Sequence, residues 1–312
     1  MEENFNSIDV EQEDEDIIEI NLEEELDEQE QIKPIEESID DNNEPAPKKG
    51  SLIFKILRYA IIAIASIVLC VSVVNIYKIS HEYSVSDKEY DDIQDDIFVS
   101  PTVPNFIIGD SSYDGSEAPT AEGGYKFLNY DHNRLVAINA DAIGYISLPA
   151  ISTNLPVVHT DNNSYYLDHT INGTKNAAGC LFSDSRNTHG FDDPNTIIYG
   201  HSMKNGAMFG MLNRYMREDF YKTGNNKYFY IYTKEGIYKY EIFAACIVPD
   251  NSLVYYTSYT ELTFKTIQGV IEKYALYDTG VTYDISDKIL TLSTCVDNDD
   301  SKRLVVCAKR MN

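Results

Sequence analysis

The segment LTLSTCVDNDDSKRLVVCAKR, residues 290–310, contains two stretches with the alternation of β-strands on either side of a short acidic stretch. The first strand, predicted at 288–294, leads into Cys295, and the second, predicted at 303–309, begins at Arg303. An antiparallel hairpin of these strands places Arg303 beside Cys295. Three roles are open for this thiol: a buried structural cysteine, half of a disulfide, or a nucleophile with a cationic partner.

The side chains of the first strand alternate between its two faces. One face carries Ile289, Thr291 and Ser293, followed by Cys295, and the other carries Leu290, Leu292 and Thr294. We expect the leucine face to pack in a core. Cys295 then projects from the more polar face at the end of the strand, toward a groove where a thiol is exposed enough to react.

The hairpin geometry argues against a disulfide at this position. Cys307 lies four residues along the second strand from Arg303, about 13 Å from Cys295 at 3.3 Å per residue, whereas a disulfide tolerates no more than about 7 Å between Cα atoms. Cys295 is therefore predicted to be free, and Cys180, Cys246 and Cys307 to be small buried hydrophobes. The cysteine spacing contains no C-x-x-C pair and no other ligand cluster, so we predict neither a metal nor a cofactor.

Short strands separated by turn signals recur through the rest of this region. They are predicted at 143–148, 155–159, 178–183, 196–200, 227–233 and 236–247, in addition to 288–294 and 303–309. Lys234 and Glu235, followed by Gly236, predict a hairpin between the fifth and sixth strands. Eight strands predict a mainly β fold, a closed barrel without exposed sheet edges.

Helices are predicted at three places around these strands. Residues 125–139 have apolar side chains at near-helical spacing and predict an N-terminal helix ahead of the barrel. Residues 208–217 predict a second helix. Residues 258–274, between the sixth and seventh strands, predict a third, with Ser258 or Thr260 as its N-cap.

A second reactive side chain follows a predicted strand, because strand 196–200 ends in Gly200 and is followed by His201. An imidazole can transfer protons at neutral pH, and Arg303 offers a permanent charge to an oxyanion. Cys295, His201 and Arg303 thus fill complementary roles. Taken singly, His201 also fits an ordinary hydrogen-bonded histidine, and Arg303 also fits an exposed ion pair with the acidic cluster at 297–300.

Two polar residues of the first strand are candidates for substrate contact. Ser293 shares the face of Cys295, and Thr294 precedes it directly, so both are predicted to border a substrate groove. The alternative is that both residues are ordinary strand residues with no contact to a substrate.

The N-terminal part of the chain has a different composition. Residues 1–49 contain 20 Asp or Glu and 3 Lys or Arg, which accounts for most of the net charge of −26. We predict that residues 1–50 form a disordered acidic tail and that residues 78–124 form a stalk and linker, helical to about Ile97. A nucleic-acid partner is not expected, because a polyanion would be repelled by this acidic chain.

An apolar segment at 51–77 separates the tail from the stalk. No charged residue occurs from Tyr59 to Tyr77, a length that nearly spans a hydrocarbon core as a helix. Basic residues concentrate on its N-terminal side, so the positive-inside bias predicts a single-pass membrane protein with a cytoplasmic N-terminus and with residues 78–312 outside. The membrane lipid is therefore an expected partner.

The pattern of motifs resembles one known family. TLSTC at 291–295, Arg303 eight residues later and YGHSM at 199–203 are similar to the signature of the sortases, cysteine transpeptidases of Gram-positive surfaces. Further matching segments follow in the same order along residues 125–312 and are most like class B: NADAIGYI (139–146), LPVV (155–158), YYLDH (165–169), AGCLFSDSRN (178–187) and MFGML (208–212). Tyr145 departs from the tryptophan expected there, and the acidic tail and linker are longer than usual.

The resemblance implies a catalytic domain at 125–312 that cleaves a C-terminal sorting motif of secreted proteins after threonine. It implies that Cys295 forms the thioester, that His201 serves as acid and base, and that Arg303 stabilises the oxyanion. The acceptor would be an amine of a peptidoglycan precursor or of a pilin. Asp193-Pro194-Asn195 lacks the aromatic residue of the lid that some pilin-polymerising sortases carry, which favours wall anchoring.

Two other functions stay open from the residues alone. The first is a cysteine hydrolase whose acyl-enzyme is discharged by water. The second is a membrane-tethered adhesion module without catalysis, in which Cys295 would react no faster than a denatured thiol. A papain-like protease fits poorly, because there the cysteine precedes the histidine.

Overall fold

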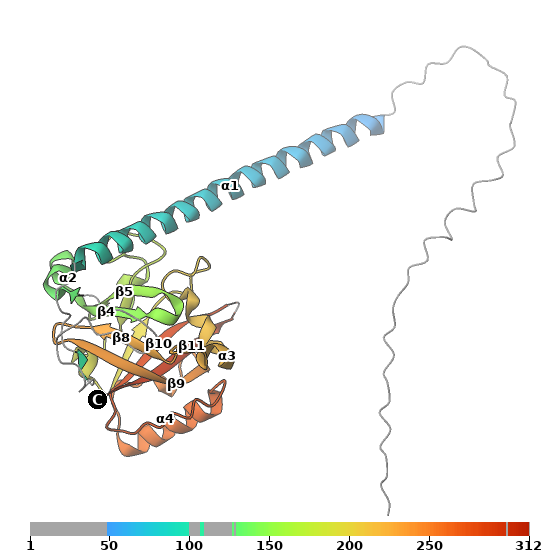
Figure 1. Ribbon diagram of the computed structural model, residues 1–312. Coiled ribbons are helices and arrows are strands. Elements are labelled where there is room, and N and C mark those ends of the chain that lie inside the picture. Colours follow the sequence, from blue (N-terminus) through green and yellow to red (C-terminus); the bar gives the residue numbers. More distant parts are fainter. Residues whose placement is uncertain (1–48, 100–106, 109–126, 128, 298, 312) are drawn as a thin grey trace, which may run out of the picture. The chain divides into compact units, whose positions relative to one another are not determined.

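The computed structural model describes residues 49–99, 107–108, 127, 129–297 and 299–311 (Figure 1). Residues 1–48 of the predicted acidic tail and most of the predicted linker after Val99 lie outside these residues. The chain divides into two compact units, Met1–Ala65 and Ser66–Asn312. The second unit contains the barrel.

Helix α1 (Lys49–Ile97) carries the apolar segment as one continuous helix. Within it, Phe54–Ile97 is long and apolar enough to cross a membrane, with a mean hydropathy of 2.5 over a window that is not buried. The helix continues through the first part of the predicted stalk, as expected. Its last turns bury Tyr90, Ile93 and Ile97 in the same core as the barrel, so this part of the stalk packs on the barrel.

The second unit is built on a closed barrel of eight strands (Figure 1). The strands are β4 (Ala142–Leu148), β5 (Thr153–His159), β6 (Leu181–Ser183), β7 (Asn195–Tyr199), β8 (Tyr228–Tyr232), β9 (Ile237–Pro249), β10 (Ile289–Val296) and β11 (Asp299–Arg310). They follow the order β11-β10-β7-β6-β5-β4-β8-β9, and pairing of β9 with β11 closes the barrel. The predicted closed barrel and its eight segments are confirmed, including the hairpin between β8 and β9.

Three very short strands were not predicted. β1 (Phe98–Val99) pairs with β3 (Asn129–Tyr130), and β2 (Ile107–Ile108) adds to the barrel beside β9. The predicted N-terminal helix at 125–139 is therefore too long at its start. Helix α2 spans only His132–Ile138, because Asn129 and Tyr130 pair as a strand and the Asp131 carboxylate caps the helix by accepting from the backbone N–H groups of Asn133 and Arg134.

The region predicted as helix 208–217 is mostly a 3₁₀ helix. η4 (Gly210–Met216) is followed by a single α-turn, α3 (Glu218–Tyr221). The tighter winding is seen in bonds between residues three apart, from the N–H of Leu212 to the carbonyl of Phe209 and from Arg217 to Arg214. Four further 3₁₀ turns complete the unit: η1 (Pro149–Ile151), η2 (Tyr165–Leu167), η3 (Gly190–Asp192) and η5 (Leu253–Tyr255).

Helix α4 (Glu261–Tyr274) lies between β9 and β10 in the chain, as predicted. Thr260 is its N-cap and forms a reciprocal capping box with Thr263, so of the two predicted caps Ser258 is wrong. The helix lies on the outside of the barrel (Figure 1) and packs its apolar stripe onto the strands. This stripe consists of Phe264, Ile267 and Ile271.

Two apolar cores result, one inside the barrel and one beneath α4. Both faces of β10 are consequently buried, which corrects the prediction of one polar face. Leu290 and Leu292 point into the barrel, whereas Ile289 belongs to the core under α4. Thr291 and Ser293 on that second face are 1% and 2% exposed. Only at Cys295 does the strand emerge from this cover.

Candidate active site

Cys295 lies near the end of β10, directly opposite Arg303 on β11. The pairing shifts register just after Cys295, because Val296 pairs with Asp299, so β11 bulges at this point. The thiol is free and exposed. The predicted hairpin, with Arg303 beside a free Cys295, is confirmed.

The other cysteines of the second unit's barrel are free and buried, as predicted. Burial raises the pKa of Cys180 and of Cys307 to about 12 in each case, although the Tyr90 hydroxyl acts in the opposite direction on Cys180. Burial likewise raises the pKa of Cys246. These three thiols are small apolar side chains in the core and poor nucleophiles.

His201 reaches the same place from the neighbouring strand. β7 runs parallel to β10, with Tyr199 opposite Ser293, and this register continued by two residues brings His201 level with Cys295. The N–H of Gly200 donates to the Ser293 carbonyl (3.1 Å), and the Thr294 hydroxyl donates to the Gly200 carbonyl (2.8 Å). A Cβ on Gly200 would lie 2.3 Å from the Leu181 side chain, so only glycine fits this close approach.

Among the described residues, the imidazole of His201 is held by one backbone contact. Its Nε2 lies 2.7 Å from the carbonyl oxygen of Leu167, in the 3₁₀ turn η2. Because a carbonyl only accepts hydrogen bonds, Nε2 carries the proton in this contact and Nδ1 is left for another partner.

The guanidinium of Arg303 is held by its own loop. Its Nη1 donates to the carbonyl oxygens of Asp300 and Lys302, each at 2.8 Å. The Asp299 carboxylate pairs with Lys302 (2.8 Å), and within the described residues no carboxylate forms an ion pair with Arg303. Lys302, and not Arg303, therefore forms the ion pair with the acidic cluster. The charge of Arg303 stays available to an oxyanion in the site.

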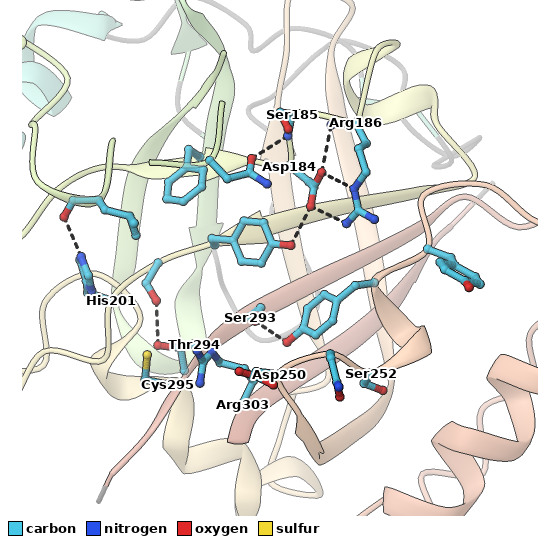
Figure 2. Close-up of a pocket in the computed structure, with 18 of the residues that line it drawn as sticks. Asp184, Ser185, Arg186, His201, Asp250, Ser252, Ser293, Thr294, Cys295 and Arg303 are labelled. Atoms are coloured by element: carbon cyan, nitrogen blue, oxygen red, sulfur yellow. Dashed lines mark hydrogen bonds and ion pairs between the residues drawn. The ribbon is translucent and has the colours of Figure 1, made fainter. Parts of the chain in front are cut away.

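All five predicted site residues line one cavity of about 720 Å³ (Figure 2). His201, Cys295 and Arg303 contribute their side chains to it. The two candidate substrate residues lie in its wall with their hydroxyls already bonded. Ser293 Oγ lies 2.9 Å from Tyr255 Oη, and Thr294 is bonded to Gly200 as described above.

The opposite wall of the cavity contains a charged group that sequence reasoning did not single out (Figure 2). The Asp184 carboxylate is fully buried and accepts from Arg186 Nε (2.8 Å), Arg186 Nη2 (2.7 Å) and Tyr199 Oη (2.7 Å). Burial alone would raise its pKa, but these hydrogen bonds hold the pKa at about 2. The only signal in the sequence was an Asp-x-Arg pattern directly after a predicted strand.

A family model described as the sortase domain matches residues 146–311. Sortase B of Listeria monocytogenes is 33% identical over 180 residues, which cover 56% of this chain and 72% of that protein.

Two solved structures of sortase B are similar to the whole barrel. The X-ray structure from Clostridium perfringens is 29% identical with a TM-score of 0.54 and covers 58% of this chain and 100% of that one. The sortase B–substrate complex from Staphylococcus aureus is 29% identical with a TM-score of 0.53 and covers 57% and 83%. The predicted resemblance is confirmed: this chain belongs to the sortase family of cysteine transpeptidases, and its relatives are of class B.

Proposed function

We propose that this sortase is anchored in a membrane by the apolar part of α1 and joins secreted proteins to an amine of the cell-wall precursor. Its substrates would carry a C-terminal sorting motif that is cleaved after threonine. The positive charges before the apolar segment favour a cytoplasmic N-terminus and an extracellular catalytic domain. The domain limits in this proposal are 1–50 for the tail, 51–77 for the anchor, 78–124 for the stalk and linker, and 125–312 for the catalytic part.

In the first half-reaction the Cys295 thiolate attacks the threonine carbonyl carbon. The carbonyl π electrons move to oxygen, and the Arg303 guanidinium stabilises that oxyanion. Collapse of the tetrahedral intermediate breaks the C–N bond, and the leaving amine takes a proton from the His201 imidazolium. The products are a thioester on Cys295, a released C-terminal segment and a neutral His201.

In the second half-reaction the acceptor amine attacks the thioester carbonyl. His201 takes a proton from the attacking nitrogen, Arg303 again stabilises the oxyanion, and Cys295 leaves as a thiolate. The new amide joins the secreted protein to the acceptor, and the enzyme returns to its starting protonation state. Ser293 and Thr294 line the cavity next to the nucleophile and would border the bound motif.

The observation that supports this proposal most directly is the grouping of three side chains from separate elements. Cys295 of β10 faces Arg303 of β11 in register, and His201 follows β7 at the level of Cys295. All three line one cavity, and the thiol is exposed there.

The test is to incubate the full chain in detergent micelles with a panel of sorting-type peptides, with and without an added amine, and to measure intact mass. We expect a peptide-sized adduct on Cys295 that is discharged faster as the amine concentration rises. Cys295→Ser should form no acyl-enzyme. Turnover near the wild-type rate in Cys295→Ser would refute the proposed chemistry.

The same assay separates the remaining alternatives. A cysteine hydrolase would release free acid at a rate independent of the amine. A pilin-polymerising sortase would prefer a lysine side chain within a folded pilin over a small wall-precursor amine. We favour the wall amine, because Asp193-Pro194-Asn195 lies within the barrel and lacks an aromatic lid residue.

A further inference from the structure

The imidazole of His201 depends on the loop that follows β5. The Leu167 carbonyl that accepts from His201 Nε2 belongs to η2, and within the described residues it is the one hydrogen-bond partner of that ring nitrogen. A displacement of this carbonyl would therefore tilt the ring. The position of the proton-transferring group is thus set by residues of the η2 segment.

The carbonyls of η2 are in turn supported by Gly179. Gly179 has φ +61°, and a Cβ there would lie 2.4 Å from the Tyr166 oxygen and 2.8 Å from the Leu167 oxygen. The next residue, Cys180, donates its N–H to the Tyr166 carbonyl at 3.0 Å. The backbone at Gly179 is therefore packed directly against the carbonyl that holds the histidine.

Helix α1 forms hydrogen bonds with the backbone at Gly179 and with the residues before it. The hydroxyl of Tyr90, a residue only 5% exposed, donates to the Gly179 carbonyl at 2.6 Å. Two more hydrogen bonds join the helix to the preceding residues: Asn176 Nδ2 donates to the Glu82 carbonyl (2.9 Å), and the N–H of Asn172 donates to Glu89 Oε1 (3.3 Å). One face of the stalk helix thus holds the loop at several points.

We propose that Tyr90 is a positioning residue for His201. Its hydroxyl holds the Gly179 peptide, which supports the Leu167 carbonyl, which in turn holds the imidazole. This inference rests on the proposed role of His201 as acid and base. It gives the stalk helix a part in the reaction, in addition to its place between the apolar segment and the barrel.

The test compares Tyr90→Phe with Tyr83→Phe in the full chain in detergent micelles. Tyr83 lies two helical turns earlier on α1, is packed against the same core, and its hydroxyl makes no hydrogen bond to the described residues. We expect Tyr90→Phe to lower kcat for acyl-enzyme formation between about twofold and tenfold, the range for one lost neutral hydrogen bond, with KM unchanged. Tyr83→Phe should leave both constants at wild-type values.

Two further measurements separate positioning from general damage. The rate of Cys295 alkylation by iodoacetamide should be the same in Tyr90→Phe and wild type, because the thiol is not part of the coupled chain. In the double variant with His201→Ala, Tyr90→Phe should have no additional effect on the residual rate. The inference would be overturned if kcat were equal in Tyr90→Phe and wild type. It would also be overturned if the rate of Cys295 alkylation fell in Tyr90→Phe by the same factor as kcat.

The outcome for His201 itself tells the two proposals apart. Should His201→Ala retain its turnover, the proposed role of His201 fails, and the inference about Tyr90 fails with it. If His201→Ala is inactive while Tyr90→Phe behaves as wild type, only the positioning role of Tyr90 is refuted.

Discussion

Two positions of the β10–β11 hairpin each carry a cysteine, and one of these cysteines is exposed whereas the other is buried. At the cavity end, Cys295 lies opposite Arg303 and its thiol is exposed. At the core end, four residues away on each strand, Thr291 lies opposite Cys307, and both are 1% exposed. The comparison shows that a cysteine of this hairpin is accessible to reagents only where no other segment covers the hairpin.

The cover is supplied by segments distant in sequence. Helix α4 and the turn η5 lie over the outer face of the hairpin, and the core beneath them includes Cys307 and Val305. Cys295 lies beyond the edge of this cover, where the cavity begins. The following predictions test this contrast between the two ends.

The largest effect is expected in thiol reactivity. Alkylation of the native protein by iodoacetamide at pH 8, followed by peptide mapping, should modify Cys295 at least about a thousandfold faster than Cys307. The reason is that a pKa of about 12 leaves only roughly one part in ten thousand of Cys307 as the thiolate. Comparable rates for the two thiols would show that the core end is open, contrary to the structure.

The next largest effect concerns the two arginines of β11. Arg303→Ala should lower kcat by about 10²- to 10³-fold, because the oxyanion loses its charged donor, and Arg303→Lys should recover part of that loss. Arg310→Lys is the matched control. Arg310 lies on the same strand but pairs with Asp192 at 2.9 Å and stacks over Tyr238. The kcat of the Arg310→Lys variant should stay within about twofold of the wild-type value in steady-state assays.

The third prediction concerns the dependence of stability on acid pH, to which the buried Asp184 carboxylate contributes. The folded pKa of Asp184 is depressed to about 2, below an unfolded value of 3.8, so its contribution to stability is present above pH 4 and is lost as the pH falls toward 2. The contribution is about 2 kcal/mol. Urea unfolding of wild type at pH 6 and pH 2.5 should show this loss.

The matching variants for that titration are two Asp→Asn changes. Asp184→Asn should lower the free energy of unfolding at pH 6 and flatten its dependence between pH 4 and pH 2. Asp192→Asn removes an exposed carboxylate and should change the free energy of unfolding by less than about 0.5 kcal/mol at pH 6. An unchanged acid dependence in Asp184→Asn would contradict the assigned role of the Asp184–Arg186–Tyr199 group.

The smallest effect compares two threonines of β10. Thr294→Val removes the hydrogen bond to Gly200 that joins the cysteine strand to the histidine strand, and should lower kcat about twofold to tenfold. Thr291→Val removes a hydrogen bond to Asn195 at the core end, and should lower the melting temperature with kcat unchanged. Equal kinetic losses in both variants would show that Thr294 has no special place in the site.

Much of this arrangement could be predicted before the structure. The period-two alternation of the eight strands is a strong signal, and each strand was located to within a few residues. The antiparallel hairpin of the last two strands was expected to place Arg303 beside Cys295, and the structure pairs these two residues. The helix at α4 was predicted at 258–274 with Ser258 or Thr260 as its N-cap, and it begins after Thr260.

Other features carried too little local signal. Strands β1, β2 and β3 are two residues long, too short for any periodicity to show. The choice between an α-helix and a 3₁₀ helix at Gly210–Met216 depends on packing around it rather than on composition. The burial of Thr291 and Ser293 depends on α4 and η5, which cover a face that polar side chains would otherwise leave to solvent.

The sequence by itself determined the barrel, the apolar segment, the family and the three residues proposed for catalysis, because alternation, hydropathy and motif spacing are properties of neighbouring residues. Only the tertiary structure decided which segments cover the buried thiols, which acid stays charged inside the wall, and how Tyr90 reaches the loop that holds His201. Burial and hydrogen bonding between segments far apart in the chain set these properties, and both exist only after the segments have come together.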